Sequence, residues 1–420
     1  MFRTEWTKEL LLASPGLTQP ALVEGAITDV AGLTAGLRRV VEAFSSSTQR
    51  PVARVFTCDG QRVDLLERLS HRAPNPALGF EQWLAEVLGE KEFCLAVNGV
   101  PSWDDDLHQV LTAGVVTPLL EELGVPVGGL DFYAFLANAG HTPFGVHADR
   151  EPSLLLHLGP ADKECLIWRR SDYARLVEAE GREFDPERDD RRFDPAAIAE
   201  HAQRLVMKPG DALLIPTGDF HIFENKGFSA FIGLSLMPAT LGAVVSEAVG
   251  LLLRDEAGTP VESAPGATAI PALRHQVLTA LEAIPDLAAR TASYAAAHLM
   301  SLRSNGYLIY KPVLDRTRPV LRPDDELEVR EDFPIFTARH EDRLHVALHG
   351  RLLDMRYDPQ IEEWFGWLAG RRSAFTCQEA VDRLDGLETG RVAERLLELA
   401  VLHRGLRLCG GSADERAQAA

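Results

Sequence analysis

Hydrophobic positions change their spacing near residue 240 of this 420-residue chain. Before that point, short apolar runs bounded by turn residues follow one another, which is typical of buried β-strands. The clearest of these runs are 132–136, 154–158, 165–168 and 212–215. After Pro238, apolar residues recur at helical spacing, from Leu241 to Leu253 and from Ile270 to Met300. The pattern therefore predicts a strand-rich part followed by a helical part.

Helical spacing also occurs inside the strand-rich part. It extends from Thr28 to Phe44, from Phe80 to Leu88, and around Leu107 and Leu119. Two strands, Val52 to Thr57 and Phe93 to Val97, are predicted among these helices. We expect these elements to brace one side of the strand-rich part.

A third unit is predicted from about Gly306 onward. Apolar residues at 344, 346 and 348 alternate with His345 and Ala347, which predicts a strand with one polar face. We therefore expect His345 and His349 to face solvent. Asp358-Pro359 and the pair Thr376 and Glu379 are signals for helix starts.

The end of this unit predicts one more helix and one more strand. Val392, Leu396 and Leu399 form one apolar stripe on a helix that ends near Gly405. An apolar segment, Leu406 to Leu408, follows it. Strands and three helices in this order predict a winged-helix-like unit.

Composition limits the function classes. The chain is 46% hydrophobic and 25% charged, which is ordinary for a globular protein, and its formal net charge of -19 argues against general nucleic-acid binding. A basic or polar partner is easier to accommodate. Five cysteines form no C-x-x-C pair, so we expect reduced thiols and a cytoplasmic protein. No apolar run is long enough to span a membrane, so no membrane partner is expected.

Candidate metal ligands lie in two segments of the strand-rich part. His147 and Asp149 are two positions apart, so on a strand both side chains would project from one face. His221 follows two turns, 209–211 and 216–219, at the start of another predicted strand. Two imidazoles and one carboxylate leave coordination positions open, as in non-haem Fe(II) oxygenases. A lone H-x-D pair occurs by chance in many proteins, so the context of His221 decides the weight of this hypothesis.

That context matches a known motif at every spacing. Gly210, Pro216, Gly218, His221 and Asn225 have the spacing G-x5-P-x-G-x2-H-x3-N of the second cupin motif. The H-x-D form of the first motif is the one found in the JmjC-type branch. Residues 15–240 therefore resemble the JmjC-like, cupin-fold oxygenases that depend on 2-oxoglutarate. The segment 20–26 is similar to the strand that opens such domains.

The resemblance implies a chemistry and a set of cosubstrate residues. It implies Fe(II), O2 and 2-oxoglutarate, with decarboxylation to succinate coupled to hydroxylation of a C–H bond. Lys163, which opens the strand that bears the basic anchor in this family, would pair with the distal carboxylate of 2-oxoglutarate. It is one residue further from His147 than the family pattern. Tyr133, Ser235 and Arg150 are the alternative partners for that carboxylate.

Two other features near the site have plainer interpretations. The charged segment from Arg169 to Arg204 is predicted to be an insertion with a solvated face, or alternatively a lid or substrate clamp. His157 lies an even number of positions from His147, so we expect a core histidine that faces the cavity without binding the metal.

The sequence as a whole predicts an α+β protein of three parts. Residues 1–240 would form a double-stranded β-helix barrel of the cupin or jelly-roll type, 241–305 a helical linker that forms a homodimer by family analogy, and 306–420 the winged-helix-like domain. The last resembles the C-terminal unit of bacterial ribosomal-protein hydroxylases of the JmjC type. It is less closely similar to leader-peptide-binding modules.

Three functions fit these observations. The first is hydroxylation of a peptide or protein side chain. The second is hydroxylation of a small molecule or a biosynthetic natural-product peptide, which the same ligands would serve. The third is a non-catalytic cupin that binds a metal or another ligand.

Overall fold

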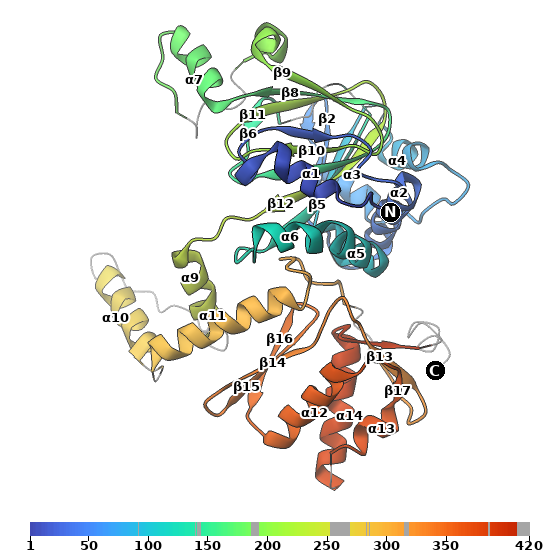
Figure 1. Ribbon diagram of the computed structural model, residues 1–420, viewed down its shortest axis with the longest axis vertical. Coiled ribbons are helices and arrows are strands. Elements are labelled where there is room, and N and C mark those ends of the chain that lie inside the picture. The colour runs from blue at the N-terminus through green and yellow to red at the C-terminus, as the bar shows by residue number, and fades with distance from the viewer. Residues whose placement is uncertain are drawn as a thin grey trace. The chain divides into compact units, whose positions relative to one another are not determined.

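The chain folds into two compact units. The computed structural model describes residues 1–90, 92–138, 140, 144–185, 193–252, 269–282, 284, 286–314, 319–384 and 387–409 (Figure 1). The first unit is Met1–Pro238 with Leu308–Val313, and the second is Ala239–Tyr307 with Leu314–Ala420. The segment Leu308–Val313 returns to the first unit, where Ile309 N donates to the carbonyl of Leu130 at 3.0 Å. The division into three domains remains a prediction.

The first unit contains a large antiparallel sheet. Its eight strands have the order β1-β10-β7-β12-β5-β4-β2-β3. Their bounds are β1 Ala21–Val23, β2 Ala53–Thr57, β3 Gly60–Gln61, β4 Cys94–Asn98, β5 Leu130–Ala137, β7 Ser153–Pro160, β10 Ala212–Ile215 and β12 Ser229–Leu236. The long strands β5, β7 and β12 are almost continuously buried, which explains why they read as apolar runs in the sequence.

A smaller antiparallel sheet completes this unit. Its order is β6-β11-β8-β9, with β6 His147–Ala148, β8 Lys163–Trp168, β9 Gln203–Met207 and β11 Phe220–Asn225. Cys165 and Ile167 of β8 pack with Leu155 of β7 and Leu213 of β10 in one hydrophobic cluster. The two sheets therefore share a core, and the unit has a mixed helix and strand composition with antiparallel sheets.

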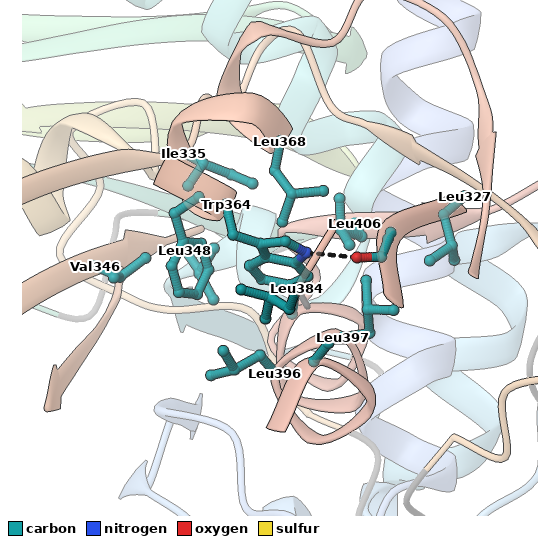
Figure 2. Packing of buried hydrophobic residues seen from close by; sticks show 14 of the residues in the cluster. Leu327, Ile335, Val346, Leu348, Trp364, Leu368, Leu384, Leu396, Leu397 and Leu406 are labelled. Atoms are coloured by element: carbon teal, nitrogen blue, oxygen red, sulfur yellow. Dashed lines mark hydrogen bonds between the residues drawn. The ribbon is translucent and has the colours of Figure 1, made fainter. Parts of the chain in front are cut away.

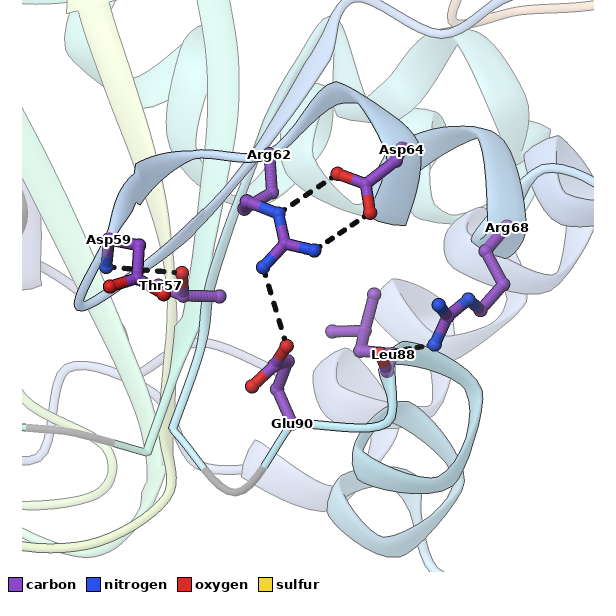
Figure 3. A network of polar contacts seen from close by, with 7 residues as sticks. All are labelled: Thr57, Asp59, Arg62, Asp64, Arg68, Leu88 and Glu90. Atoms are coloured by element: carbon purple, nitrogen blue, oxygen red, sulfur yellow. Dashed lines mark hydrogen bonds and ion pairs between the residues drawn. The ribbon is translucent and has the colours of Figure 1, made fainter.

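Helices accompany the large sheet. They are α1 Trp6–Ala13, α2 Val30–Ser46, α3 Val63–Leu69, α4 Phe80–Leu88, α5 Asp105–Leu111 and α6 Thr117–Leu123, with a π-helical turn at Thr112–Val116. The predicted helix from Thr28 begins after Asp29, whose side chain accepts from the Gly32 amide. Figure 3 shows how Arg62 joins Asp64 in α3 to Glu90 after α4, while Arg68 donates to the carbonyl of Leu88.

The predicted insertion packs in part against the small sheet. Helix α7, Arg170–Ala179, buries Tyr173 and Val177, and the Tyr173 ring stacks on Phe220 with centroids 3.8 Å apart. A short helix α8, Pro195–Ile198, adds Ile198 to the same cluster. This half of the insertion therefore has a packed face as well as a solvated one. Residues 186–192 lie outside the described part of the chain.

The second unit begins with three helices. They are α9 Leu241–Leu252, α10 Ala269–Glu282 and α11 Leu287–Arg303. The single predicted helical stretch from Ile270 to Met300 is thus wrong, because it is two helices. The sequence has a proline at 285 between them, and proline lacks the amide that would continue a helix. The sequence between the two helical stretches also predicts a loop from Ala257 to Gly266, which lies outside the described residues.

Two three-stranded sheets and three helices follow. One sheet has the order β14-β15-β16, with β14 Phe336–His340, β15 Arg343–Leu348 and β16 Arg351–Arg356. The other is β17-β13-β18, with β13 Glu326–Val329, β17 Phe375–Thr376 and β18 Leu406–Leu408. The helices are α12 Pro359–Gly370, α13 Cys377–Val381 and α14 Leu387–Leu402.

Packing in this unit centres on Trp364 of α12. Figure 2 shows its ring among leucines from α12, α14 and the strands, with its indole N–H donating to the carbonyl of Ala380 at 2.8 Å. Both predicted helix starts are confirmed, since Asp358 accepts from the amide of Gln360 and Thr376 from that of Glu379.

The predicted exposure of two histidines is wrong. His345 is 1% exposed and His349 is fully buried. Helix α11 packs on the face of β15 that the alternation assigned to solvent, and the Tyr294 ring contacts His345 edge-on at 4.9 Å. His349 stacks on Phe333 at 4.0 Å. The alternation of apolar and polar residues in a strand does not show whether a helix packs on the polar face of its sheet.

Two chain-wide expectations can be compared with the structure. All five cysteines are free thiols, and Cys94, Cys165 and Cys377 are buried. Among the described residues, no helix combines the length and the apolar character needed to cross a membrane.

Candidate metal centre

The three predicted ligands converge. His147 and His221 are direct partners in the antiparallel pair of β6 and β11, and their ring centroids are 4.5 Å apart. The carboxylate of Asp149 has one oxygen 3.9 Å from His147 Nε2 and the other 3.8 Å from His221 Nε2. One atom from each residue lies within 4.8 Å of the others, so a single ion between them would be reached by all three.

Local backbone geometry brings the two segments together. Gly218 adopts φ +78°, a left-handed conformation that favours glycine, and its amide donates to the carbonyl of Asp149 at 2.9 Å. Gly210 adopts φ +102°, and a Cβ there would lie 3.2 Å from the carbonyl oxygen of Ile27. The glycines of the motif are therefore required by the two turns that carry β10 and β11 past the H-x-D segment.

Hydrogen bonds orient both imidazoles in the same way. His147 Nδ1 lies 2.9 Å from the carbonyl oxygen of Gly145, and His221 Nδ1 lies 3.2 Å from that of Asp219. A carbonyl oxygen only accepts, so each Nδ1 carries the proton and donates. Each Nε2 then has a free lone pair directed at Asp149, which is the arrangement typical of metal-binding histidines.

Charge around the triad also suits a cation. Within the described part of the chain, no lysine or arginine forms an ion pair with Asp149. Burial, assisted by the nearby His147, lowers the pKa of His221 to about 4, against the opposing effect of Asp149. His221 is therefore neutral near pH 7 and available as a ligand.

A cavity of about 310 Å³ opens beside the triad. Its walls combine polar side chains, such as Arg54, Asn98 and Glu151, with five aromatic ones, Tyr133, Phe135, Phe144, Phe223 and Phe231. This volume is at the lower end of the range for small-molecule sites. The cavity leaves space next to the triad for further ligands.

Two of the three predicted cosubstrate residues line this cavity. Tyr133 and Ser235 both face it from the adjacent strands β5 and β12. The Tyr133 ring lies over Gly233, where a Cβ would come within 2.2 Å of it, so the glycine makes room for the ring. Burial raises the pKa of the Tyr133 phenol, which therefore stays protonated.

Lys163 is deeper and does not line the cavity itself. It is fully buried, and its Nζ donates to Asn225 Oδ1 at 2.5 Å. The rings of Phe231 and Phe223, which do line the cavity, have their centroids 4.9 and 5.5 Å from this nitrogen. Among the described residues, no carboxylate forms an ion pair with Lys163, and burial lowers its pKa to about 8. A buried cation without a counter-ion is costly, so this site favours an incoming anion.

Two residues that the sequence placed near the metal pair take other positions. Arg150 is exposed and is not among the residues that line the cavity. His157 is buried as predicted and does not belong to the triad. It lies beyond Leu155 on β7, where its Nε2 contacts the carbonyl oxygen of Ala161 at 2.9 Å.

Other cavity residues were not predicted from the sequence. Glu151 lines the cavity two positions after Asp149, and the same alternation that paired His147 with Asp149 would have indicated it. Burial, together with Asp149 and Asp131, raises the pKa of its carboxyl group. Arg54 of β2 also lines the cavity, with its guanidinium 5.4 Å from the Phe144 centroid. Its position depends on the long-range pairing of β2 with β4, which no local pattern shows.

Comparison with known proteins gives structural matches only. No family model and no curated protein matches the sequence. An X-ray structure of E. coli YcfD matches with a TM-score of 0.50 and 16% identity, covering 97% of this chain and 99% of that one. This chain has a YcfD-like fold.

Two further structures of YcfD also match. One is described as a ribosomal oxygenase from Escherichia coli, with a TM-score of 0.49, 15% identity, and coverage of 96% of this chain and 98% of that one. The other contains YcfD with cobalt and 2-oxoglutarate, with a TM-score of 0.49, 14% identity, and coverage of 98% and 99%.

Proposed function

We propose that this protein is an Fe(II)- and 2-oxoglutarate-dependent hydroxylase that acts on a protein side chain. The observation that carries the proposal is the convergence of His147, Asp149 and His221 beside a cavity. The YcfD-like fold supports it, because YcfD is described as a ribosomal oxygenase and has been solved with cobalt and 2-oxoglutarate.

The residues present fit the implied metal. Two imidazole nitrogens and one carboxylate that has no cationic partner among the described residues are a donor set suited to Fe(II), and this group of described residues contains no thiolate. When bound, iron and 2-oxoglutarate would supply O2 activation and C–H hydroxylation, with succinate as coproduct. The chain's own part is to hold the metal and to orient the cosubstrate beside it.

Lys163 is the residue we propose for the distal carboxylate of 2-oxoglutarate. It is a buried cation whose nearest partner, Asn225, is neutral. Phe223 and Phe231 separate it from the cavity, so the cosubstrate would have to displace these rings or reach the nitrogen past them. Tyr133 and Ser235, which line the cavity directly, would add hydrogen bonds from their hydroxyl groups.

A protein substrate agrees with the charge of the chain. The net charge of -19 favours a basic partner, and ribosomal proteins are commonly basic. This substrate class is also that of the fold neighbour, which is described as a ribosomal oxygenase. The side chain and the atom that would be hydroxylated are to be found by experiment.

Two measurements test the proposal. Purified protein with Fe(II), O2 and 2-oxoglutarate should form succinate, and chelation of the metal should stop it. Absence of 2-oxoglutarate turnover, whether or not the protein binds a metal, would favour the non-catalytic cupin instead. A mass-spectrometric screen of basic proteins and peptides for the gain of one oxygen atom then separates a protein substrate from a small molecule or natural-product peptide.

The fold proposal is a double-stranded β-helix in the first unit. Eight of its strands form two interleaved antiparallel groups, β10-β7-β12-β5 and β6-β11-β8-β9, which supports a jelly-roll arrangement. In the second unit, the sheet β17-β13-β18 with α12, α13 and α14 supports a winged-helix-like domain.

We also propose a homodimer formed through the helical region. Helices α9 and α10 expose apolar side chains, namely Leu241, Val245, Leu273, Val277 and Leu278. Exposed apolar side chains on neighbouring elements mark interaction sites, and two-fold dimers are the commonest assembly. Light scattering at micromolar concentration should give twice the chain mass, and a monomer mass would contradict the dimer.

A further inference from the structure

We propose that Ser153 is a positioning residue that fixes the carboxylate of Asp149 for metal binding. This inference rests on the proposed function. Ser153 is the first residue of β7, is only 2% exposed and lines the metal cavity. Its hydroxyl donates to Asp149 Oδ2 at 3.1 Å.

Asp149 needs such a partner because little else holds its side chain. It directly follows β6, which is only two residues long, and the hydrogen bond from Gly218 reaches its backbone carbonyl. One carboxylate oxygen faces each histidine, and a single oxygen serves as the ligand, so the rotation of the carboxylate decides which oxygen reaches the ion. A hydrogen bond to one oxygen fixes the rotation of the carboxylate and hence the direction of the other.

The orientation of the Asp149 carboxylate matters because a second carboxylate lies nearby. Glu151 also lines the cavity, two positions after Asp149. Ser153 and Ser235 are direct partners across β7 and β12, and both line the cavity. The hydrogen bond from Ser153 goes to Asp149, so this serine assigns the ligand role to Asp149 rather than to Glu151.

The test measures Co(II) affinity without cosubstrate, so it does not depend on turnover. Ser153→Ala should weaken Co(II) binding by about 10–100-fold, the range typical of a lost partner of a metal ligand. Ser153→Thr keeps the hydroxyl on a residue that suits a strand, so it should restore most of the affinity. Ser45→Ala is the matched control, since it removes the hydroxyl of an equally buried serine of the first unit that bonds to the carbonyl of Glu42 and does not line the cavity, and it should leave Co(II) affinity unchanged.

The outcomes separate this inference from the proposed function. If the unaltered protein binds Co(II) and Ser153→Ala binds it equally tightly, the positioning role is wrong while the metal centre stands. Equal losses in Ser153→Ala and Ser45→Ala would likewise overturn it, because the effect would then come from removing any buried hydroxyl group. Failure of the unaltered protein to bind Co(II) would overturn the metal centre and this inference with it. Thermal unfolding of each variant shows whether a loss reflects misfolding.

Discussion

Each unit of the molecule contains a cluster of histidine and aspartate that is buried or half-buried. The two clusters differ in the groups that contact the aspartate carboxylate. In the first unit, Asp149 faces two histidines and a serine, without a cationic partner among the described residues. In the second unit, Asp354 accepts from Arg343 Nε at 2.8 Å and from the hydroxyl of Tyr294. His345 lies 3.8 Å from Asp354, yet neither of its ring nitrogens has a hydrogen-bond partner in the described structure.

The difference explains why the first cluster suits a metal ion better than the second. Burial alone would raise the pKa of Asp354, but the hydrogen bonds from Arg343 and Tyr294 outweigh it and hold that pKa below its usual value. Asp354 is thus already compensated, and its oxygens are taken. Asp149 has no cationic partner among the described residues, so its carboxylate is available to an ion, and the orientation of both imidazoles serves the same purpose.

The largest expected effect is the loss of metal binding in His221→Ala. Removing one of three protein ligands should weaken Co(II) binding by more than the roughly 100-fold that an outer partner contributes, and Fe(II)-dependent succinate formation should stop. Isothermal titration with Co(II) and a succinate assay measure the two effects. Circular dichroism should remain that of the folded protein, because the core does not depend on the ion.

His345→Ala is the counterpart of this variant in the second unit. It removes a buried histidine beside an aspartate that already has its partners, so Co(II) affinity should not change. A comparable loss of Co(II) binding in both variants would show that the distinction between the two clusters is wrong.

Next in size is the effect of Lys163→Met, which should act in opposite directions on binding and stability. Removing the cation that pairs with a buried carboxylate costs about 2–5 kcal/mol, or more than about 30-fold in the Kd of 2-oxoglutarate. The same change removes a buried charge, so the protein without cosubstrate should be more stable by about 1–4 kcal/mol. Chemical denaturation and titration with 2-oxoglutarate in the presence of Co(II) measure both. If the affinity for 2-oxoglutarate does not change, then Tyr133 or Ser235, rather than Lys163, binds its distal carboxylate.

The strands and the ligand triad could be predicted from the sequence because their signals are local. The runs at β7, β8 and β10 are apolar throughout, and the glycines at 210 and 218 occupy backbone conformations that favour glycine. The spacing of the motif therefore reflects the turns at Gly210 and Gly218. The convergence of His147 with His221 follows from the pairing of two strands that these turns align.

What could not be predicted depends on packing between distant segments. The burial of His345 results from α11, and the position of Arg54 results from the pairing of β2 with β4. The break between α10 and α11 had a local signal in Pro285, which the apolar periodicity of the whole stretch outweighed. The triad could be predicted from this one sequence. Only the tertiary structure shows which carboxylate lacks a cationic partner.

A smaller effect is expected on the stability of the first unit at acidic pH. His157 is fully buried, its pKa is lowered to about 4 by burial and then by the charge of Lys163, and its Nδ1 has no partner in the described structure. The unfolded chain takes up a proton here near pH 6.5, whereas the folded chain does so only near pH 4, so stability falls as pH decreases through that window.

The matching variant is His157→Gln, whose amide can still donate to the carbonyl of Ala161. Between about pH 7 and pH 5 the unaltered protein should lose about 2 kcal/mol more than this variant. Urea denaturation at both pH values measures the difference. Parallel pH profiles for the two proteins would contradict the assignment of this proton to His157.

The smallest effect concerns the compensated cluster of the second unit. Arg343→Ala leaves Asp354 with only the Tyr294 hydroxyl, but the carboxylate is 24% exposed and water can replace part of the lost partner. We therefore expect a loss of about 1 kcal/mol, below the cost of breaking a fully buried pair. Arg407→Ala is the matched control, because its pair with Glu328 is more exposed, at 61% and 34%, and should contribute less. Urea denaturation followed by tryptophan fluorescence compares the two variants. If Arg343→Ala costs no more than Arg407→Ala, then Arg343 is not what stabilises the charge of Asp354, and the compensation that distinguishes this cluster from the metal centre must come from Tyr294.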